Sequence, residues 1–438
     1  MVGGYYRAIL YTSKVASKVT QDPIISSNQR TRPHLTYLDG IRGFAALWVM
    51  GWHAIILGSH VNPWKADLPK PLAISVSFLS SIFFHYATLA VVAFIVLSGY
   101  VLSIPICTGS GVKLQGGFGR YILRRAKRIL PPYYAALVFS VVVMAFTPWV
   151  HRVANWTGGE NWWNNQFPVL APGVIVSHLL LLHNRSALWF EKINGPLWSI
   201  AVEWQIYFLL PLLLLPLWRK FGLASALAFA WIVGLGSLFF APWLLGLEGW
   251  YVGPFACGMV AAELSINHER YRWLQKMRFN FIGWLFLGLM VLCYALQGKS
   301  HGIGLIWLLD KSSYRFWLMG ALFAAGFSCL LIAGTSALNQ NRTTLVTRFS
   351  TLRPLVFVGG FSYSLYLIHV PIFDLAFAIT ASHEHWARLL PVVTFCAAPA
   401  LAITCAYGFH LCFERPFMNT KPQTPWLPNV DAGAPRAD

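Results

Sequence analysis

Long apolar blocks, separated by short polar or basic segments, recur along the whole chain. A helix of about 20 apolar residues crosses the roughly 30 Å hydrocarbon core of a bilayer. Apolar residues make up 57% of the 438 residues and charged residues only 11%, whereas a soluble domain carries about 25% charged residues. The sequence therefore predicts an all-α fold, a polytopic bundle of membrane-spanning helices.

The apolar blocks and the charges beside them predict about ten spanning helices and one partial helix. The block 171–184 is too short to span, and the alternation of basic segments requires the chain to enter and return there. Such a re-entrant or half helix is stable only when protein buries it. We expect an N-terminal tail over 1–36, a membrane domain over 37–418 and a disordered C-terminal tail over 419–438. The predicted spans are 41–60, 73–105, 130–150, 196–217, 223–243, 250–266, 281–297, 316–336, 355–379 and 390–412.

The distribution of positive charge predicts the topology. The net charge is +18, and most Lys and Arg residues lie in short segments between apolar blocks, as the positive-inside rule requires of cytoplasmic loops. We therefore expect a multi-pass protein with both termini in the cytoplasm and no nucleic-acid partner. The N-terminal segment lacks the apolar run of a cleavable signal. Asn155 begins an Asn-Trp-Thr sequon in a polar, Trp-rich segment, and it is a candidate glycosylation site if that segment faces a lumen.

The cysteines argue against a metal centre. The seven cysteines are scattered, odd in number and mostly inside apolar blocks. Their spacing matches no metal motif and no disulfide framework. We interpret them as packing residues of the membrane core and expect no metal.

The first span carries ionisable residues within an apolar helix. Arg42 and His53 are eleven residues apart, which is three turns with about 20° of drift, so the two side chains share one face. His53 then lies about 16 Å beyond Arg42, near the middle of the bilayer, where ionisable groups usually mark a functional site. Imidazole suits proton transfer near neutral pH. The structural alternatives are that Asp39 caps the helix, Arg42 anchors it at the cytoplasm and His53 is a neutral core residue.

A second span carries a carboxylate. Ser199, Glu203 and Tyr207 are spaced four residues apart and stack on one helical face. A carboxylate in lipid needs a partner or a polar cavity. Glu203 is therefore a candidate site residue, or else a structural partner for an Arg or Trp donor.

A third polar stripe lies in the segment 359–371, where Ser362, Tyr366 and His369 share one face. Gly359 and its neighbour Gly360 would let another helix approach closely. Hydroxyl groups in membrane helices often serve only to join helices, and this alternative applies to Ser362 more than to His369.

The densest basic cluster falls in the segment 120–129, which we expect to be a cytoplasmic loop. It contains Arg124, Arg125, Lys127 and Arg128, more cations than topology alone needs. Arg125 and Arg128 share one face at i, i+3 spacing, and guanidinium groups bind phosphate in a bidentate manner. Positive-inside anchoring is the alternative reading.

Together, six segments resemble the acyltransferase-3 family of integral membrane acyltransferases. Each segment alone is weakly specific, but they occur in the family's order and extend over nearly the whole chain. The region 223–340 matches only in hydrophobicity. The six segments are "YLDGIRGFAALWVMGWHA", "FIVLSGYVLS", "RRAKRILPPYY", "NGPLWSIAVEWQIYFLLP", "GGFSYSLYLIHVP" and "FERPF".

The resemblance implies transfer of an acyl group, usually acetyl from acetyl-CoA, to a hydroxyl of a sugar or small metabolite. The N-terminal tail and the Trp-rich segment resemble fungal members, some of which acetylate terpenoid-type natural products. The family pattern also implies essential roles for Arg42 and His53 and donor contacts for Arg125 and Arg128. Glu203 matches the family's glutamate.

We accordingly expect His53 to act as general base, with Glu203 or Asp39 orienting its imidazole or carrying the proton onward. No Ser or Cys shows the signature of a nucleophile, so direct transfer is preferred, and an acyl-histidine relay stays open. The donor phosphates are expected to contact Arg42, Arg124, Arg125 and Arg128. The acceptor cavity is expected to be lined by Ser362, Tyr366 and His369.

Two other functions remain open at this point. A transporter or lipid-binding protein would use the same buried polar residues as a path through the membrane and would need no thioester. A different class of membrane acyltransferase would use a long-chain donor, which the Arg42–His53 spacing disfavours.

Overall fold

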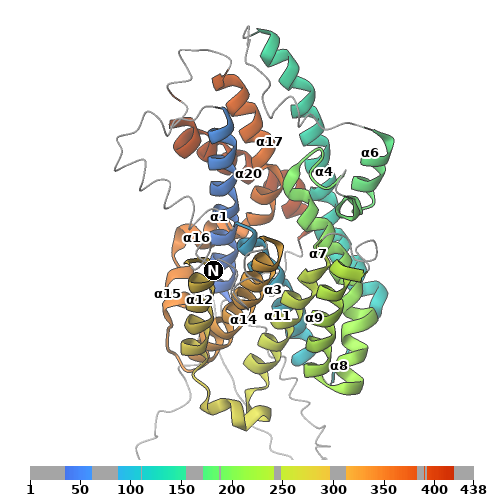
Figure 1. Ribbon diagram of the computed structural model, residues 1–438, viewed down its shortest axis with the longest axis vertical. Coiled ribbons are helices and arrows are strands. Elements are labelled where there is room, and N and C mark those ends of the chain that lie inside the picture. The colour runs from blue at the N-terminus through green and yellow to red at the C-terminus, as the bar shows by residue number, and fades with distance from the viewer. Residues whose placement is uncertain are drawn as a thin grey trace, which may run out of the picture. The chain divides into compact units, whose positions relative to one another are not determined.

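In the computed structural model of the protein, the described residues form helices and no strand. The long helices lie side by side as a bundle (Figure 1). The described residues are 35–61, 87–109, 111–153, 171–186, 189–240, 248–295, 312–381, 389 and 392–418. The helices are α1 (Thr36–Val61), α3 (Ala87–Cys107), α4 (Gly117–Val153), α6 (Pro172–Leu179), α7 (Trp198–Leu209), α8 (Leu215–Phe221), α9 (Leu223–Phe240), α11 (Val252–Ile266), α12 (Phe279–Ala295), α14 (Ser312–Asn339), α15 (Leu345–Ser350), α16 (Arg353–Gly360), α17 (Ser362–Ala381) and α20 (Ala398–Phe409).

Shorter helical segments complete or join these helices. A π-helical segment, η5, continues α7 into α8, and the π-helical segments η8 and η9 flank α20. The bounds of these three are Leu210–Leu214, Val393–Ala397 and His410–Glu414. The 3-10 segments are η3 (His183–Arg185), η4 (Gly195–Leu197), η6 (Gly249–Tyr251), η7 (His268–Lys276) and η10 (Arg415–Phe417).

The predicted membrane architecture is confirmed. A described helix overlaps each predicted span, and the span 355–379 is divided between α16 and α17. Among the described residues, 6 helices are long and apolar enough to cross a membrane by length and composition. Leu223–Gly236 and Phe279–Cys293 are shorter apolar helices. The first residues of the predicted span 73–105, the glycosylation candidate Asn155 and nearly all of both tails lie outside the described residues.

The prediction of a loop over 120–129 is wrong, because this segment forms the first turns of α4. Arg, Lys, Leu and Ala are strong helix formers, and long cationic side chains can extend from a helix end into water while their stems stay on apolar surface. Tyr121 and Ile129 are buried on one side of these turns, whereas Arg128 is exposed. The helix therefore holds the cations at fixed positions.

The predicted half helix is α6, which ends after two turns. Its last carbonyl groups have no helical partner of their own. Tyr133 donates to the carbonyl oxygen of His178 over 2.8 Å, and Tyr134 donates to that of Leu179 over 2.8 Å. Both tyrosines belong to α4. Because protein donors satisfy its open end, a short helix is tolerated here.

Glycine contacts set the spacing of two helix pairs. A Cβ atom at Gly99 of α3 would lie 2.0 Å from the carbonyl oxygen of Phe255, and one at Gly258 of α11 would lie 2.0 Å from that of Val96. The backbones of α3 and α11 therefore touch, as small residues allow in membrane helices.

The same device joins α1 to α16. A Cβ atom at Gly43 would lie 2.0 Å from the carbonyl oxygen of Leu355, and one at Gly359 would lie 2.0 Å from that of Asp39. The predicted close approach is confirmed at Gly359, whereas a Cβ atom at Gly360 would meet nothing within 4 Å. Helix α1 also packs on α17, and the two helices lie side by side in Figure 1.

The C-terminal "FERPF" segment is tied to the start of α17. The carboxylate of Glu414, only 3% exposed, accepts a hydrogen bond from Ser364 over 2.5 Å. Its same oxygen lies 2.9 Å from Nδ1 of His410. A buried carboxylate needs such partners, so this contact holds α17, the helix that carries Tyr366 and His369, against the end of the membrane domain.

The glycine contact between α3 and α11 predicts a stability effect. Replacing Gly258 by Ala should lower the melting temperature of the protein in detergent, because overpacking a tight contact costs about 1–3 kcal/mol. Gly288→Ala is the matched control, since a Cβ atom at this exposed position of α12 would meet nothing within 4 Å. Equal melting temperatures for the two variants would contradict the tight contact.

Candidate active site

Two histidines from distant parts of the chain meet inside the bundle. Nδ1 of His53 on α1 lies 3.1 Å from Nε2 of His369 on α17, and the ring centroids are 4.9 Å apart. His369 is 1% exposed, and His53 is half-buried. The packing of α1 on α17 therefore joins the expected base to a residue expected in the acceptor cavity.

The hydrogen bonds of the pair assign the tautomers. Nδ1 of His369 lies 3.0 Å from the carbonyl oxygen of Leu365. A carbonyl only accepts, so this nitrogen carries the proton, and Nε2 of the neutral ring has a lone pair. Nδ1 of His53 lies 2.9 Å from the carbonyl oxygen of Val49 and therefore also carries a proton, which it shares with His369. The basic nitrogen of neutral His53 is therefore Nε2.

Asp39 and Arg42 form an ion pair at the other end of α1. Nη1 of Arg42 lies 2.8 Å from Oδ1 of Asp39. Arg42 also interacts electrostatically with Arg128 and Tyr207. The structure thus places Asp39 against Arg42, about 21 Å along the helix from His53. The side chain that contacts the His53 imidazole is that of His369.

Glu203 is held by two hydroxyl groups. Ser98 of α3 and Tyr207 of α7 both donate hydrogen bonds to its Oε1 atom. Tyr207 interacts electrostatically with Arg125 of α4 as well as with Arg42. Glu203 is therefore linked through Tyr207 to two arginines.

Ser199 lies on α7 one turn before Glu203. Its hydroxyl oxygen is 2.6 Å from that of Tyr366 on α17. Tyr366 also donates to the carbonyl oxygen of Pro196 over 3.2 Å, and its ring centroid lies 5.9 Å from that of His369. We call the line of residues from the cationic end to the histidine pair the polar track. It consists of Arg42, Arg125, Tyr207, Glu203, Ser199, Tyr366, His369 and His53.

Ser362 lies outside this track. Its hydroxyl donates to the carbonyl oxygen of Gly359 over 3.0 Å and is buried. It therefore satisfies the end of α16, at the junction between α16 and α17.

The basic cluster of α4 divides into two groups. Arg128 and Lys127 are exposed, whereas Arg125 is half-buried and its Nε atom is buried without a hydrogen-bond partner. Arg124 donates to the carbonyl oxygen of Gln115 over 3.1 Å. Within the described part of the chain, Arg125 and Arg128 have no ion-pair partner. This end of the site carries uncompensated positive charge, which favours an anionic ligand.

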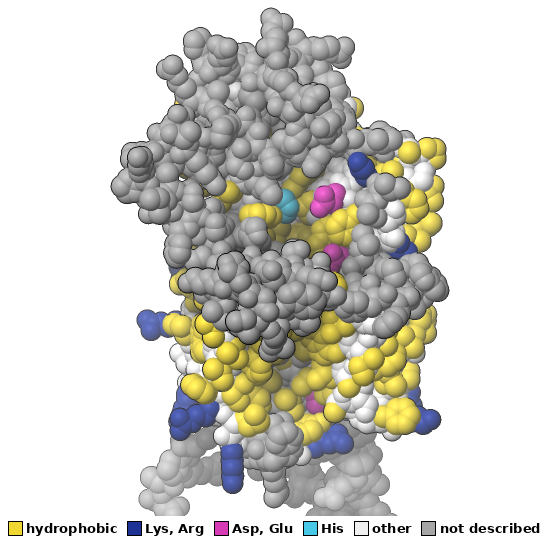
Figure 2. All heavy atoms as spheres, in the orientation of Figure 1, with side chains coloured by type: hydrophobic (Ala, Val, Ile, Leu, Met, Phe, Trp, Pro, Cys, Tyr) yellow, Lys and Arg dark blue, Asp and Glu magenta, His cyan; other side chains and the backbone are white. Residues whose placement is uncertain are grey.

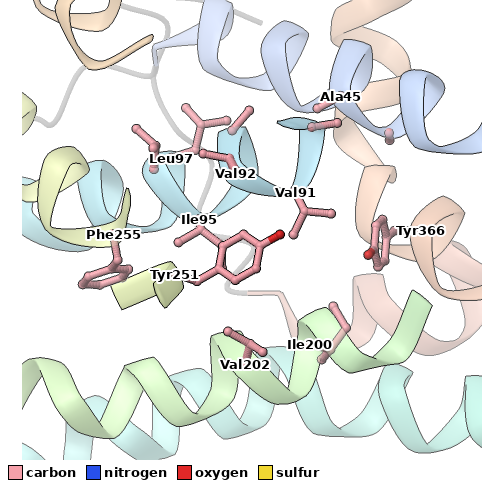
Figure 3. Close-up of a cluster of buried hydrophobic side chains, with 14 of the residues drawn as sticks. Ala45, Val91, Val92, Ile95, Leu97, Ile200, Val202, Tyr251, Phe255 and Tyr366 are labelled. Atoms are coloured by element: carbon pink, nitrogen blue, oxygen red, sulfur yellow. The ribbon is translucent and has the colours of Figure 1, made fainter. Parts of the chain in front are cut away.

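A buried tyrosine lies beside the track. Tyr251 is 0% exposed, and its hydroxyl has no hydrogen-bond partner in the part of the chain that the structure describes. Its ring packs against Trp250 and Trp198, with centroids 4.2 Å and 5.7 Å away. Figure 3 shows its hydroxyl directed between α3 and α7 towards Tyr366. Figure 2 shows a histidine and acidic side chains among apolar side chains on one face.

Sequence reasoning did not identify Ser98, Tyr121 or Tyr251. Ser98 and Tyr251 lie on helices whose partners are far apart in sequence, so no local pattern connects them with Glu203 or Tyr366. Tyr121 could have been identified from the sequence, because it precedes Arg125 by four residues and thus shares its helical face. Among the described residues, no group of three or more His, Cys, Asp or Glu side chains is arranged to hold a metal ion.

A comparison with known families identifies the chain. The model of the acyltransferase-3 family, described as an acyltransferase domain, matches residues 35–411. No curated protein and no solved structure matches the chain. The match covers the helices that carry the histidine pair, the polar track and the basic cluster. The chain therefore belongs to the acyltransferase-3 family and is a membrane acyltransferase.

Proposed function

We propose that this acyltransferase moves an acetyl or other short acyl group from acyl-CoA to a hydroxyl of a small metabolite, either a terpenoid-like compound or a sugar. The contact between His53 and His369 carries the proposal, because it leaves the Nε2 lone pair of His53 available as a base. A general base of this kind contributes about 10²–10⁴ in rate.

The proposed step balances without a metal ion or a covalent enzyme intermediate. Nε2 of His53 removes the proton of the acceptor hydroxyl as its oxygen attacks the thioester carbonyl. The tetrahedral intermediate then collapses, the C–S bond breaks and the CoA sulfur receives the proton from His53. During this step His53 is positively charged, and the Nδ1–H bond to His369 stabilises that charge.

The cationic end of the site suits the donor. CoA is polyanionic, and Arg125 and Arg128 have no ion-pair partner in the described part of the chain. Arg42 and His53 are about 16 Å apart along α1, a distance comparable to an extended pantetheine arm. A donor held at the arginines would therefore bring its thioester near the histidine pair.

The aromatic end suits the acceptor. Tyr366 lies near Tyr251, whose buried hydroxyl has no hydrogen-bond partner among the described residues, and the ring of His369 packs against Tyr366. Phe94 also packs against Tyr366, with ring centroids 5.9 Å apart. Aromatic faces and few hydroxyl groups favour a largely apolar acceptor over a sugar, because every buried sugar hydroxyl would need its own partner.

The proposed orientation follows the charge distribution. The basic cluster of α4 and both tails would face the cytoplasm, where acyl-CoA is supplied. The protein would reside in an endomembrane or the plasma membrane.

His53→Ala should lower the turnover number about 10²–10⁴-fold, because the base is lost. The measurement is release of free CoA from acetyl-CoA with a hydroxyl compound that the wild-type protein acylates. His268→Ala, at an exposed position outside the site, is the control for folding and insertion. Retention of more than a tenth of wild-type turnover in His53→Ala would remove His53 as the base.

His369→Leu should lower kcat while leaving the KM for acetyl-CoA unchanged. A hydrogen bond to a charged group contributes about 1.5–3 kcal/mol, which corresponds to about 10–150-fold in rate. His369→Gln should retain more activity, because its amide oxygen can accept from Nδ1 of His53. Equal kcat values for the two variants would contradict the positioning role of His369.

Acetyl-CoA should raise the melting temperature of the purified wild-type protein, because a ligand that binds only the folded state stabilises it. The rise should be lost in Arg125→Ala/Arg128→Ala, and Arg125→Ala alone should chiefly raise the donor KM. A folded wild-type protein that shows no rise would favour a transporter or a different donor. A larger rise with a long-chain acyl-CoA would favour a long-chain acyltransferase.

A further inference from the structure

Two polar atoms on the inner face of α4 are buried without a hydrogen-bond partner among the described residues. They are the hydroxyl of Tyr121 and Nε of Arg125. Tyr121 is 3% exposed. The two residues are four apart on one helix, so their side chains lie one above the other on the same face.

Such atoms are uncommon in folded proteins, because a buried polar group without a partner loses the hydrogen bonds that water would supply. Nε–H of Arg125 can only donate, and the hydroxyl of Tyr121 can donate. Two neighbouring donors with no protein acceptor are complementary to carbonyl oxygens of a bound molecule.

The electrostatic surroundings of Tyr121 and Arg125 differ from those of the exposed Lys127 and Arg128. Tyr121 interacts electrostatically with Arg125 and with Glu203, and Tyr207 interacts with the same two charges. Arg125 and Glu203 thus act on the same two tyrosines, so a group bound beside Tyr121 would lie near charges of both signs. A phosphate placed here would meet the carboxylate of Glu203 and lose its hydration, whereas a neutral amide would not.

We propose that the acyl-CoA site has two parts, and that Tyr121 and Nε of Arg125 bind the neutral amide carbonyls of the pantetheine arm. The exposed Arg128 and Lys127 bind the phosphates outside this pair. The arm then follows the polar track past Glu203 and brings the thioester to His53. This inference rests on the proposed function, since it takes acyl-CoA as the donor.

The experiment measures dissociation constants on the full-length protein in lipid nanodiscs. The probes are acetyl-CoA, 3′,5′-ADP and S-acetyl-4′-phosphopantetheine, the last two measured by displacement of labelled acetyl-CoA. Tyr121→Phe should weaken acetyl-CoA about tenfold, which corresponds to about 1.4 kcal/mol, and should weaken the phosphopantetheine thioester equally. Its affinity for 3′,5′-ADP should be unchanged.

Arg128→Ala is the complementary variant. It should weaken acetyl-CoA and 3′,5′-ADP but leave the phosphopantetheine thioester nearly unchanged. Tyr407→Phe, which removes an exposed hydroxyl on α20, is the control and should match the wild type with all three probes.

A structural role for Tyr121 makes a different prediction. If its hydroxyl served folding, Tyr121→Phe would lower the melting temperature of the ligand-free protein. Because the hydroxyl has no protein partner, we expect the ligand-free melting temperature to be unchanged or raised. Loss of affinity together with retained stability therefore identifies a ligand contact.

The failures can be told apart. If the wild-type protein does not bind acetyl-CoA, the proposed function fails and the inference fails with it. If the wild type binds and Tyr121→Phe binds equally well, the inference alone is overturned. It is also overturned if Tyr121→Phe weakens 3′,5′-ADP, or if the phosphopantetheine thioester cannot displace acetyl-CoA from the wild type.

Discussion

The backbone contact between α1 and α16 controls the geometry of the site. At Gly43 and Gly359 the two helices approach so closely that a single methyl group would overlap a carbonyl oxygen. Helix α16 leads directly into α17, so this contact also limits how α17 can move against α1. The 3.1 Å contact between His53 and His369 joins those two helices. Because a catalytic arrangement tolerates displacements of only about 0.5 Å, the glycines at one end of α1 help to position His53, the proposed base, at the other.

Most polar groups inside the bundle form hydrogen bonds with one another, and a few keep an unused donor or lone pair. Glu203 accepts from Ser98 and Tyr207, and Ser199 pairs with Tyr366. In a low-dielectric interior such pairs avoid the cost of burying a lone polar group. In the proposed mechanism the satisfied groups serve the fold, and the proton transfer is assigned to the histidine pair, where the Nε2 lone pair of His53 is left over.

Much of the fold could be predicted from the sequence, whereas the contacts of the site could not. Apolar length and flanking charge are local properties, and they predicted the spans and the half helix. The shared face of Arg42 and His53 also follows from one helix alone. The partner of His53 is 316 residues away, and no periodicity within a single helix encodes that contact. The basic segment at the start of α4 was wrongly predicted as a loop because its charge suggested solvent, although its residues are strong helix formers.

Three of the unpartnered atoms among the described residues lie at the two ends of the polar track, and others lie elsewhere in the bundle, as at Ser103 and Ser328. Each unused buried donor costs about 1–3 kcal/mol, a cost that a bound ligand would remove at the ends of the track. Tyr121 and Arg125 are left unused at the cationic end, and Tyr251 is left unused at the aromatic end. Between them lie Glu203 and Tyr366, which are satisfied. Unused donors at both ends of a satisfied middle are what two ligands would require if each entered from its own end and met at the histidines. A single transported solute would instead need open polar groups along its whole path.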